Sequence, residues 1–227
     1  MIRPVILTVP GLLGSGDGHW QTLWEQERSD TRRIELGDWD NPNRTVWMSR
    51  IDQAVAAAQA PVVLVAHSLG CQAVTWWANA IGISGSATVL GAMLVAPPAT
   101  DRTELDPRIA RFAHEPRRGL PFVSLLIASE DDPYATIEES QALARLWGAG
   151  LVDMGKAGHI NTRSGLGSWP QGQAVAELLR DTRTGNVRRL ARQAQALLLG
   201  HAEARPAPAI SLLGDLWFTA DAGTKRS

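Results

Sequence analysis

The chain has 227 residues, which is enough for one sizeable core with an appendage but too few for two comfortable cores. Hydrophobic residues make up 44% of the sequence and charged residues 20%, as is typical of a soluble globular protein. The net charge is −1, so the charge balance gives no reason to expect a nucleic-acid or anionic-membrane partner.

The sequence also limits where the protein is expected to work. The single cysteine, Cys71, excludes an internal disulfide and fits a reducing compartment. Pro10-Gly11 interrupts the apolar N-terminal run, and no small-residue cleavage site follows, so we do not expect a signal peptide. No stretch approaches the roughly 20 apolar residues of a membrane span. We therefore expect a cytoplasmic protein with no membrane span.

Short, apolar, β-branched runs alternate along the chain with longer segments of helical period. In chain order the predicted elements are a strand over 5–9, a helix over 20–27, a short strand over 33–36, a helix over 46–58, a strand over 62–66, a helix over 69–80, buried strands within 88–97 and 121–129, a helix over 137–147, a weaker strand over 150–154 and a helix over 171–180. This alternation predicts a mainly parallel sheet with helices on both faces, which is a doubly wound α/β domain spanning residues 1–181.

The character of the chain changes after Asp181, so we treat residues 182–227 as a C-terminal extension. Residues 186–200 form a basic amphipathic pattern, 201–210 are rich in alanine and proline, and 211–218 are a short apolar segment. The extension is expected to be a helix docked on the core followed by a flexible end. A homodimer or partner contact, or a membrane-surface helix, is the alternative.

The segment Ala66-His67-Ser68-Leu69-Gly70 follows a predicted strand at the edge where parallel sheets bind ligands. It is an A-x-S-x-G variant of the nucleophile elbow, in which the serine sits on a strained turn between strand and helix. The flanking positions must be small because strand and helix pass closely there. Ser68 is therefore the candidate nucleophile, with an N-cap serine as the alternative. Cys71, one turn into the helix, is expected to pack against the sheet.

A serine hydroxyl needs a base to take its proton, and that base needs an orienting carboxylate. His159 is the candidate base because it lies in a glycine-flanked loop after the last predicted strand. His67 is expected to point elsewhere on the elbow, and His19, after the first glycine-rich loop, is expected to line the site.

The carboxylate is expected from the strand end between the serine and the histidine. Asp131 and Asp132 both follow that strand, and either could serve. We prefer Asp132, because a residue before proline is pressed into extended geometry that would aim it inward. The order serine, aspartate, histidine is the one found in α/β-hydrolases.

An oxyanion site requires two N–H donors, which we assign to the backbone of Leu12 and Leu69. Leu12 follows Pro10-Gly11 in the glycine-rich loop after the first strand. The same loop could be a phosphate cradle, but it lacks the Lys-Ser/Thr of a P-loop and the G-x-G-x-x-G spacing.

With these residues in view, five motifs resemble the small serine hydrolase family of the α/β-hydrolase superfamily, the group that includes retinoblastoma-binding protein 9. The motifs are "VPGLLGSGDGHWQTLWE", "DWDNPNRTVWMSRID", "LVAHSLG", "ASEDDPY" and "AGHINTRSGLGSWPQG". The resemblance implies a compact α/β-hydrolase fold with little or no cap domain, and Ser68, Asp132 and His159 as nucleophile, orienting acid and base. It implies no cofactor and no metal. The candidate rim of the substrate site is Gly11, His19, Trp20, Trp39 and His67.

The sequence therefore predicts a serine hydrolase that cleaves a small ester or related acyl substrate through an acyl-enzyme. An acyltransferase or a lyase could use the same triad. A binding module on a hydrolase scaffold is the alternative from another class, and the nine tryptophans of the chain favour it.

Overall fold

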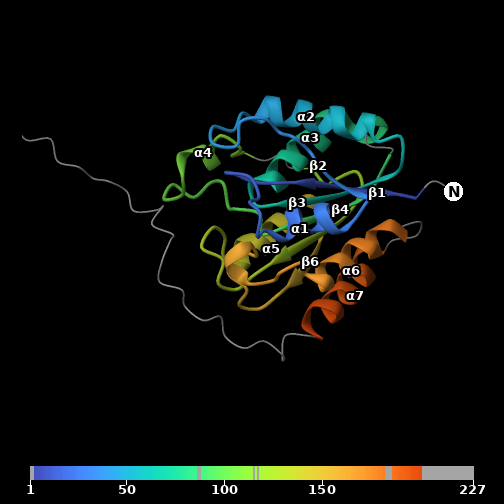
Figure 1. Cartoon of the computed structure of the whole chain (residues 1–227). Coiled ribbons are helices and arrows are strands. Elements are labelled where there is room, and N and C mark those ends of the chain that lie inside the picture. Colours follow the sequence, from blue (N-terminus) through green and yellow to red (C-terminus); the bar gives the residue numbers. More distant parts are fainter. Residues whose placement is uncertain (1–2, 86–87, 115, 117, 182–185, 201–227) are drawn as a thin grey trace, which may run out of the picture.

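The computed structural model describes residues 3–85, 88–114, 116, 118–181 and 186–200 (Figure 1). Six parallel strands form one sheet in the order β2-β1-β3-β4-β5-β6. The strands are β1 (Val5–Val9), β2 (Thr31–Arg33), β3 (Val62–His67), β4 (Val89–Val95), β5 (Val123–Ala128) and β6 (Gly150–Asp153). The α-helices are α1 (Trp20–Glu27), α2 (Arg44–Ala57), α3 (Leu69–Gly85), α4 (Pro107–Ala110), α5 (Ile137–Trp147), α6 (Pro170–Leu178) and α7 (Val187–Leu199). Two short 3₁₀ turns, η1 (Thr162–Ser164) and η2 (Leu179–Asp181), complete the described elements.

Helices cover both faces of the sheet, as the alternating pattern predicts. Side chains of β3 alternate between the two faces, with Leu64 and Ala66 on one face and Val63 and Val65 on the other, and all four are fully buried. The first face packs against α2, α3, α4 and α5, and the second against α1, α6 and α7. Figure 1 shows α2 and α3 on one side of the sheet and α6 and α7 on the other. The predicted compact α/β class is therefore confirmed.

Several elements differ from the sequence prediction: α3 extends to Gly85 instead of ending at residue 80, and η1 was not predicted. The strand expected over 33–36 is β2 at Thr31–Arg33. Ile34 and Leu36 are buried, 2% and 0% exposed, but the register with β1 ends at Arg33, after which the Ile34 N–H donates to Thr8 O at 2.9 Å.

The helix α4 was not predicted, although Asp106 caps its N-terminus and Pro107 starts it. It is the only helix that the structure describes between β4 and β5, and it has four residues. The described part of the fold therefore has little that could serve as a cap domain over the sheet edge.

The helix α7 packs against the far edge of the sheet. Leu190, Ala194 and Leu198 are buried in the same apolar cluster as α1 and α6. A Cβ on Gly150 would lie 2.9 Å from Ala191 Cβ, so β6 and α7 approach each other closely. The expected linker over 201–210 and the apolar segment over 211–218 lie outside the described residues. In the described part of the chain, no helix combines the length and apolar character needed to cross a membrane.

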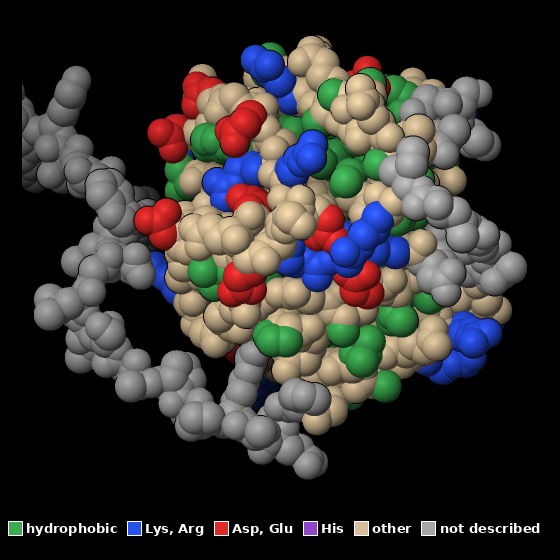
Figure 2. All heavy atoms as spheres, turned by 45° about the vertical axis from the view of Figure 1, so that its right-hand side comes forward, with side chains coloured by type: hydrophobic (Ala, Val, Ile, Leu, Met, Phe, Trp, Pro, Cys, Tyr) green, Lys and Arg blue, Asp and Glu red, His purple; other side chains and the backbone are tan. Residues whose placement is uncertain are grey.

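An ion-pair network joins the turn between α1 and β2 to α6 and η2. Asp30 accepts hydrogen bonds from Arg28 at 3.1 Å and from Arg180 at 2.9 Å, and Arg28 also pairs with Glu177. Burial opposes ionisation of Asp30, but the two arginines hold its pKa below the ordinary value. Acidic and basic side chains are interspersed on the face shown in Figure 2.

Candidate active site

The site lies where the strand order reverses direction, at the carboxyl ends of β1 and β3. Ser68 follows β3 with a φ of 52°, in the left-handed region that is costly for a residue with a side chain. Its N–H donates to Val95 O at 2.9 Å, which fixes the turn. A Cβ on Gly70 would lie 2.3 Å from Val9 O, so only glycine lets α3 start beside β1. The strained elbow expected from the sequence is present.

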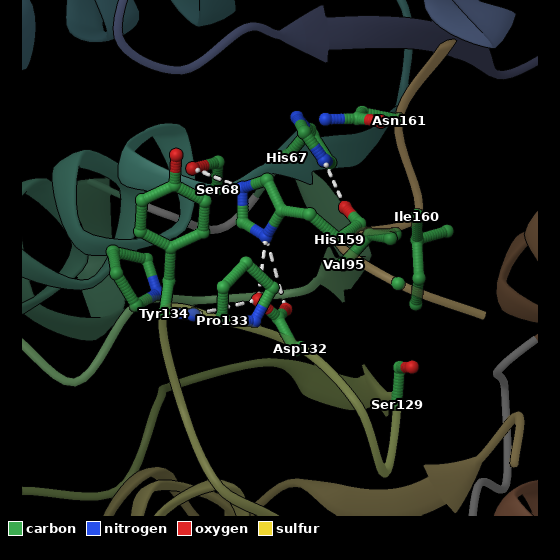
Figure 3. Close-up of polar contacts among 12 residues, drawn as sticks. His67, Ser68, Val95, Ser129, Asp132, Pro133, Tyr134, His159, Ile160 and Asn161 are labelled. Atoms are coloured by element: carbon green, nitrogen blue, oxygen red, sulfur yellow. Dashed lines mark hydrogen bonds and ion pairs between the residues drawn. The ribbon is translucent and has the colours of Figure 1, made fainter. Parts of the chain in front are cut away.

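Three side chains from three loops form a hydrogen-bonded row (Figure 3). His159 Nε2 lies 2.9 Å from Ser68 Oγ, and His159 Nδ1 lies 2.9 Å from both carboxyl oxygens of Asp132. The His159 and Asp132 side chains are 9% and 4% exposed. Because a carboxylate only accepts, Nδ1 carries the imidazole proton and Nε2 is free to accept the proton of the serine hydroxyl.

The two adjacent aspartates have different surroundings. Asp132 contacts His159 and also accepts the Tyr134 N–H at 2.9 Å, whereas Asp131 accepts the Gly158 N–H at 2.7 Å and the Ser129 hydroxyl at 2.9 Å. Burial opposes ionisation of Asp131, but these two hydrogen bonds hold its pKa below the ordinary value. The sequence left either Asp131 or Asp132 as the partner of His159, and in the structure it is Asp132 that contacts the histidine.

The loop after β1 lies directly against the elbow. A Cβ on Gly11 would lie 2.8 Å from Ser68 Cβ and 3.0 Å from Leu69 N. Leu12, the next residue, lines the cavity that contains Ser68. Within the described part of the chain, the N–H groups of Leu12 and Leu69 donate to no hydrogen bond. Both are thus available to an oxygen atom bound beside Ser68.

A cavity of about 500 Å³ holds Ser68 in its wall. It is lined by Leu12, Leu13, Gly14, Gly16, His19, His67, Ser68, Asp106, Ile109, Tyr134, His159, Asn161, Thr162 and Arg163. The sequence did not predict that residues of α4 and η1 line the cavity, and it did not predict Tyr134 there. The Tyr134 ring lies 4.3 Å from the His159 ring, and burial and the charge of Asp132 raise the pKa of its phenol. Tyr134 stands two residues after Asp132, which is the one signal that could have indicated it.

The two tryptophans expected on the rim do not line the cavity. Trp20 is 1% exposed and lies beneath the site, where its Nε1 donates to Ile160 O at 2.8 Å. Trp39 packs behind the loop after β1, with its carbonyl accepting the Leu13 N–H at 3.0 Å. Both rings support loops of the site from behind, which a motif match alone does not reveal. Gly11 likewise touches the elbow without lining the cavity.

The two other histidines of the site are buried. His19 is 4% exposed and caps α1, its Nδ1 accepting the Gln21 N–H at 3.2 Å. Burial, aided by Arg33 and His159, lowers the pKa of His19 to about 3. Burial lowers the pKa of His67 well below its ordinary value. Both rings are therefore uncharged at neutral pH. Within the described residues, no group of three or more histidine, cysteine, aspartate or glutamate side chains could hold a metal ion.

Comparison with solved structures finds close relatives in fold. A protein described as a YdeN-like hydrolase from Pectobacterium atrosepticum is 32% identical, with a TM-score of 0.67 over 78% of this chain and 91% of that chain. The YdeN gene product of Bacillus subtilis is 21% identical, with a TM-score of 0.63 over 78% and 98%. Est1E of Butyrivibrio proteoclasticus, at 14% identity and a TM-score of 0.57 over 80% and 87%, shares the fold.

None of the curated proteins compared with the chain matches it. The sequence model of the serine hydrolase family matches residues 6–177, a span that contains the elbow and both partners of Ser68. The chain is accordingly an α/β-hydrolase enzyme and belongs to the serine hydrolase family.

Proposed function

We propose that the protein cleaves a small ester or related acyl substrate through an acyl-enzyme on Ser68. The observation that carries the proposal is the hydrogen-bonded row, in which Ser68 Oγ, the His159 ring and the Asp132 carboxyl group are 2.9 Å apart at each step. A serine hydroxyl becomes a competent nucleophile when such a base takes its proton.

In this mechanism His159 Nε2 takes the proton of Ser68 as Oγ attacks the acyl carbon, and Asp132 stabilises the imidazolium that forms. The N–H groups of Leu12 and Leu69 hold the developing oxyanion. His159 then gives its proton to the leaving group. Water repeats the sequence on the acyl-enzyme, releasing the acid and restoring the serine.

The cavity favours a compact, partly apolar substrate. A volume of about 500 Å³ lies within the range of small-molecule sites. Leu12, Leu13 and Ile109 give it an apolar wall, which suits the acyl chain of a carboxylic ester. Two further proposals rest on the sequence. The five sequence motifs support kinship with retinoblastoma-binding protein 9. The single cysteine, Cys71, which is buried, supports a reducing, cytoplasmic setting.

A fluorophosphonate probe and p-nitrophenyl esters of rising chain length test the proposal. We expect the probe to label the wild type and the Ser49→Ala control, whose serine is exposed on α2, but not Ser68→Ala. Ester hydrolysis by Ser68→Ala should fall by about 10⁴- to 10⁶-fold in kcat. Equal labelling of wild type and Ser68→Ala would contradict the proposal. Adding an alcohol to the ester assay tests for acyl transfer. If the acyl group is recovered as a new ester and not as the free acid, the protein is an acyltransferase and not a hydrolase.

The alternative of a binding module rested on the tryptophan content. Most of the described tryptophan side chains are buried at 0–1% exposure, namely Trp20, Trp24, Trp47, Trp77, Trp147 and Trp169. These rings fill the core and the floor of the site, so they offer no surface to a partner. Their burial favours the enzyme over the binding module.

A further inference from the structure

The loop that carries His159 is fastened by side chains from several other segments. Glycines at positive φ flank it, with φ of 64° at Gly155 and 58° at Gly158, and Ile160 has a φ of 49°, which is strained for a β-branched residue. Such a loop needs outside contacts to keep one conformation. Four consecutive residues receive them: Ala157 N–H donates to Ser129 Oγ, Gly158 N–H to Asp131 Oδ1, His159 O accepts from His67 Nε2, and Ile160 O accepts from Trp20 Nε1.

One of these contacts connects the elbow directly to the base. His67 is the last residue of β3 and the neighbour of Ser68 in the chain. Its Nε2 lies 3.0 Å from His159 O, and its ring centroid lies 4.9 Å from that of His159 (Figure 3). A carbonyl oxygen only accepts, so His67 Nε2 must carry the proton. His67 thus both packs beside the imidazole and holds its main chain.

We propose that His67 is a positioning residue for the base, whose Nε2–H fixes the His159 main chain so that the imidazole stays within hydrogen-bond reach of Ser68. The inference rests on the proposed function of the site. Because His67 and Ser68 are consecutive on one rigid strand end, the donor that holds the base and the hydroxyl that needs it move together. The distance between Ser68 Oγ and His159 Nε2 is then set by the end of β3 and not by the glycine-flanked loop.

The surroundings of His67 suit this role. The side chain is 5% exposed and packs edge-on against His19, with ring centroids 4.7 Å apart. Close packing on two sides leaves the ring little freedom to swing away from the carbonyl. Burial keeps it neutral, so it adds no positive charge that would repel the imidazolium formed during catalysis.

Two substitutions separate the hydrogen bond from the shape of the ring. His67→Phe keeps a ring but removes the donor, and His67→Gln restores an N–H at a similar reach. We expect His67→Phe to lower kcat roughly 100-fold, the size of effect that a misplacement of about 1 Å produces, with KM within about twofold of wild type. His67→Gln should recover at least about tenfold of that loss.

Trp24→Phe is the matched control, because it also removes a buried donor, but to Ser168 O, which lies outside the loop that carries His159. We expect both Phe variants to lower the thermal unfolding midpoint, but only His67→Phe to lose most of kcat. Equal losses of kcat in the two variants, or no rescue by His67→Gln, would overturn the inference and leave only a general contribution to loop stability.

A measurement on the wild type keeps the test independent of activity and of variant folding. Nitrogen-15 NMR of the histidine rings should find His67 protonated at Nε2, not at Nδ1, with slow exchange of that proton. The Nδ1-protonated form would overturn the inference. If the wild type neither hydrolyses esters nor reacts with the fluorophosphonate, the proposed function fails, and the NMR result still decides whether His67 holds the His159 loop.

Discussion

At the scale of single residues, the contact between Gly11 and the elbow leaves no room for a methyl group. An alanine Cβ there would meet Ser68 Cβ at 2.8 Å and Leu69 N at 3.0 Å, and neither atom can swing aside. We expect Gly11→Ala to push Leu12 away from the oxyanion position and lower kcat by about 10²- to 10³-fold, the cost of one oxyanion donor. Steady-state ester hydrolysis measures this.

Gly119→Ala is the control for that substitution, since the nearest atom to its added Cβ is Trp147 O at an ordinary 3.8 Å. It should keep the kcat of the wild type. A Gly11→Ala enzyme with unchanged kcat would mean that the loop after β1 tolerates displacement and that Leu12 is not an oxyanion donor.

The buried histidines predict a loss of stability in mild acid. The pKa of His19 falls from 6.5 to about 3 on folding, so between these values the unfolded chain binds a proton that the folded chain does not. Stability is therefore full above pH 6.5 and declines as pH falls toward 3, by about 1.4 kcal/mol per pH unit for this ring. His67 adds a decline of the same sign.

Urea unfolding between pH 6.5 and pH 5 checks this, in a range above most carboxyl titrations. His19→Gln should have a shallower dependence of unfolding free energy on pH than wild type. His114→Gln, whose side chain is 90% exposed, controls for the removal of an imidazole. Identical slopes in wild type and His19→Gln would contradict the argument.

Residues that follow strands could be predicted, because a parallel sheet sends all its carboxyl ends to one edge. Ser68, Asp132 and His159 were selected this way, and Pro133 favoured the aspartate that the structure brings to His159. The direction of a side chain that does not follow a strand could not be predicted in the same manner. Trp20 lies on the first turn of a helix whose inner face was unknown from the sequence, so the motif match left open whether it lies on the rim or beneath the site.

At the scale of elements, the predicted bounds of a strand or helix agree best with the structure where the element is most buried. The central strand β3, buried on both faces, was predicted to within one residue because its apolar run is continuous. The edge strand β2 is short and contains no apolar residue, because it pairs with β1 alone. The buried apolar residues Ile34 and Leu36 follow it, and their pattern was therefore mistaken for the strand. The helix α4 has four residues, too few for a helical period to show.

The N-cap of helix α5, Thr136, lies four residues after Asp132, and the start of the helix depends on it. Thr136 Oγ1 accepts the Glu139 N–H at 3.2 Å, and Glu139 Oε2 accepts the Thr136 N–H at 2.7 Å, which together form a capping box. We expect Thr136→Ala to lower the free energy of unfolding by about 1 kcal/mol, measured by urea denaturation. Thr45→Ala, an exposed threonine inside the first turn of α2, should not be destabilising, and a similar loss in both variants would argue against the cap.

At the scale of the whole molecule, α7 lies beyond the residues that the family model matches, and it covers the edge strand β6. The match ends at residue 177, whereas α7 spans Val187–Leu199 and packs on β6. The Gln195 side chain accepts the Asp153 N–H at 2.9 Å and donates to Asp153 O at 2.6 Å, so an amide pairs with the exposed edge of β6. Edge strands without such cover are prone to pair with other chains.

This arrangement predicts that a chain ending at Asp181 is less stable than the full chain. Removing α7 uncovers the sheet face beneath Leu190 and Leu198, and each buried leucine is worth about 1.5–3 kcal/mol. We expect a lower urea midpoint for the shortened chain, together with aggregation detected by light scattering. Equal midpoints would show that α7 contributes little to the stability of the sheet.

Single substitutions in the full chain test the same packing without shortening it. Leu190 is 8% exposed on the inner face of α7, and Leu199 on the same helix is 45% exposed. Leu190→Ala should lower the free energy of unfolding by about 2–5 kcal/mol, because it removes buried methyl groups and leaves a cavity. Leu199→Ala should change it by less than about 0.5 kcal/mol, since its side chain already contacts water. If the two variants unfold at the same urea concentration, α7 is not anchored through the face that Leu190 occupies, and the loss in the shortened chain must arise elsewhere.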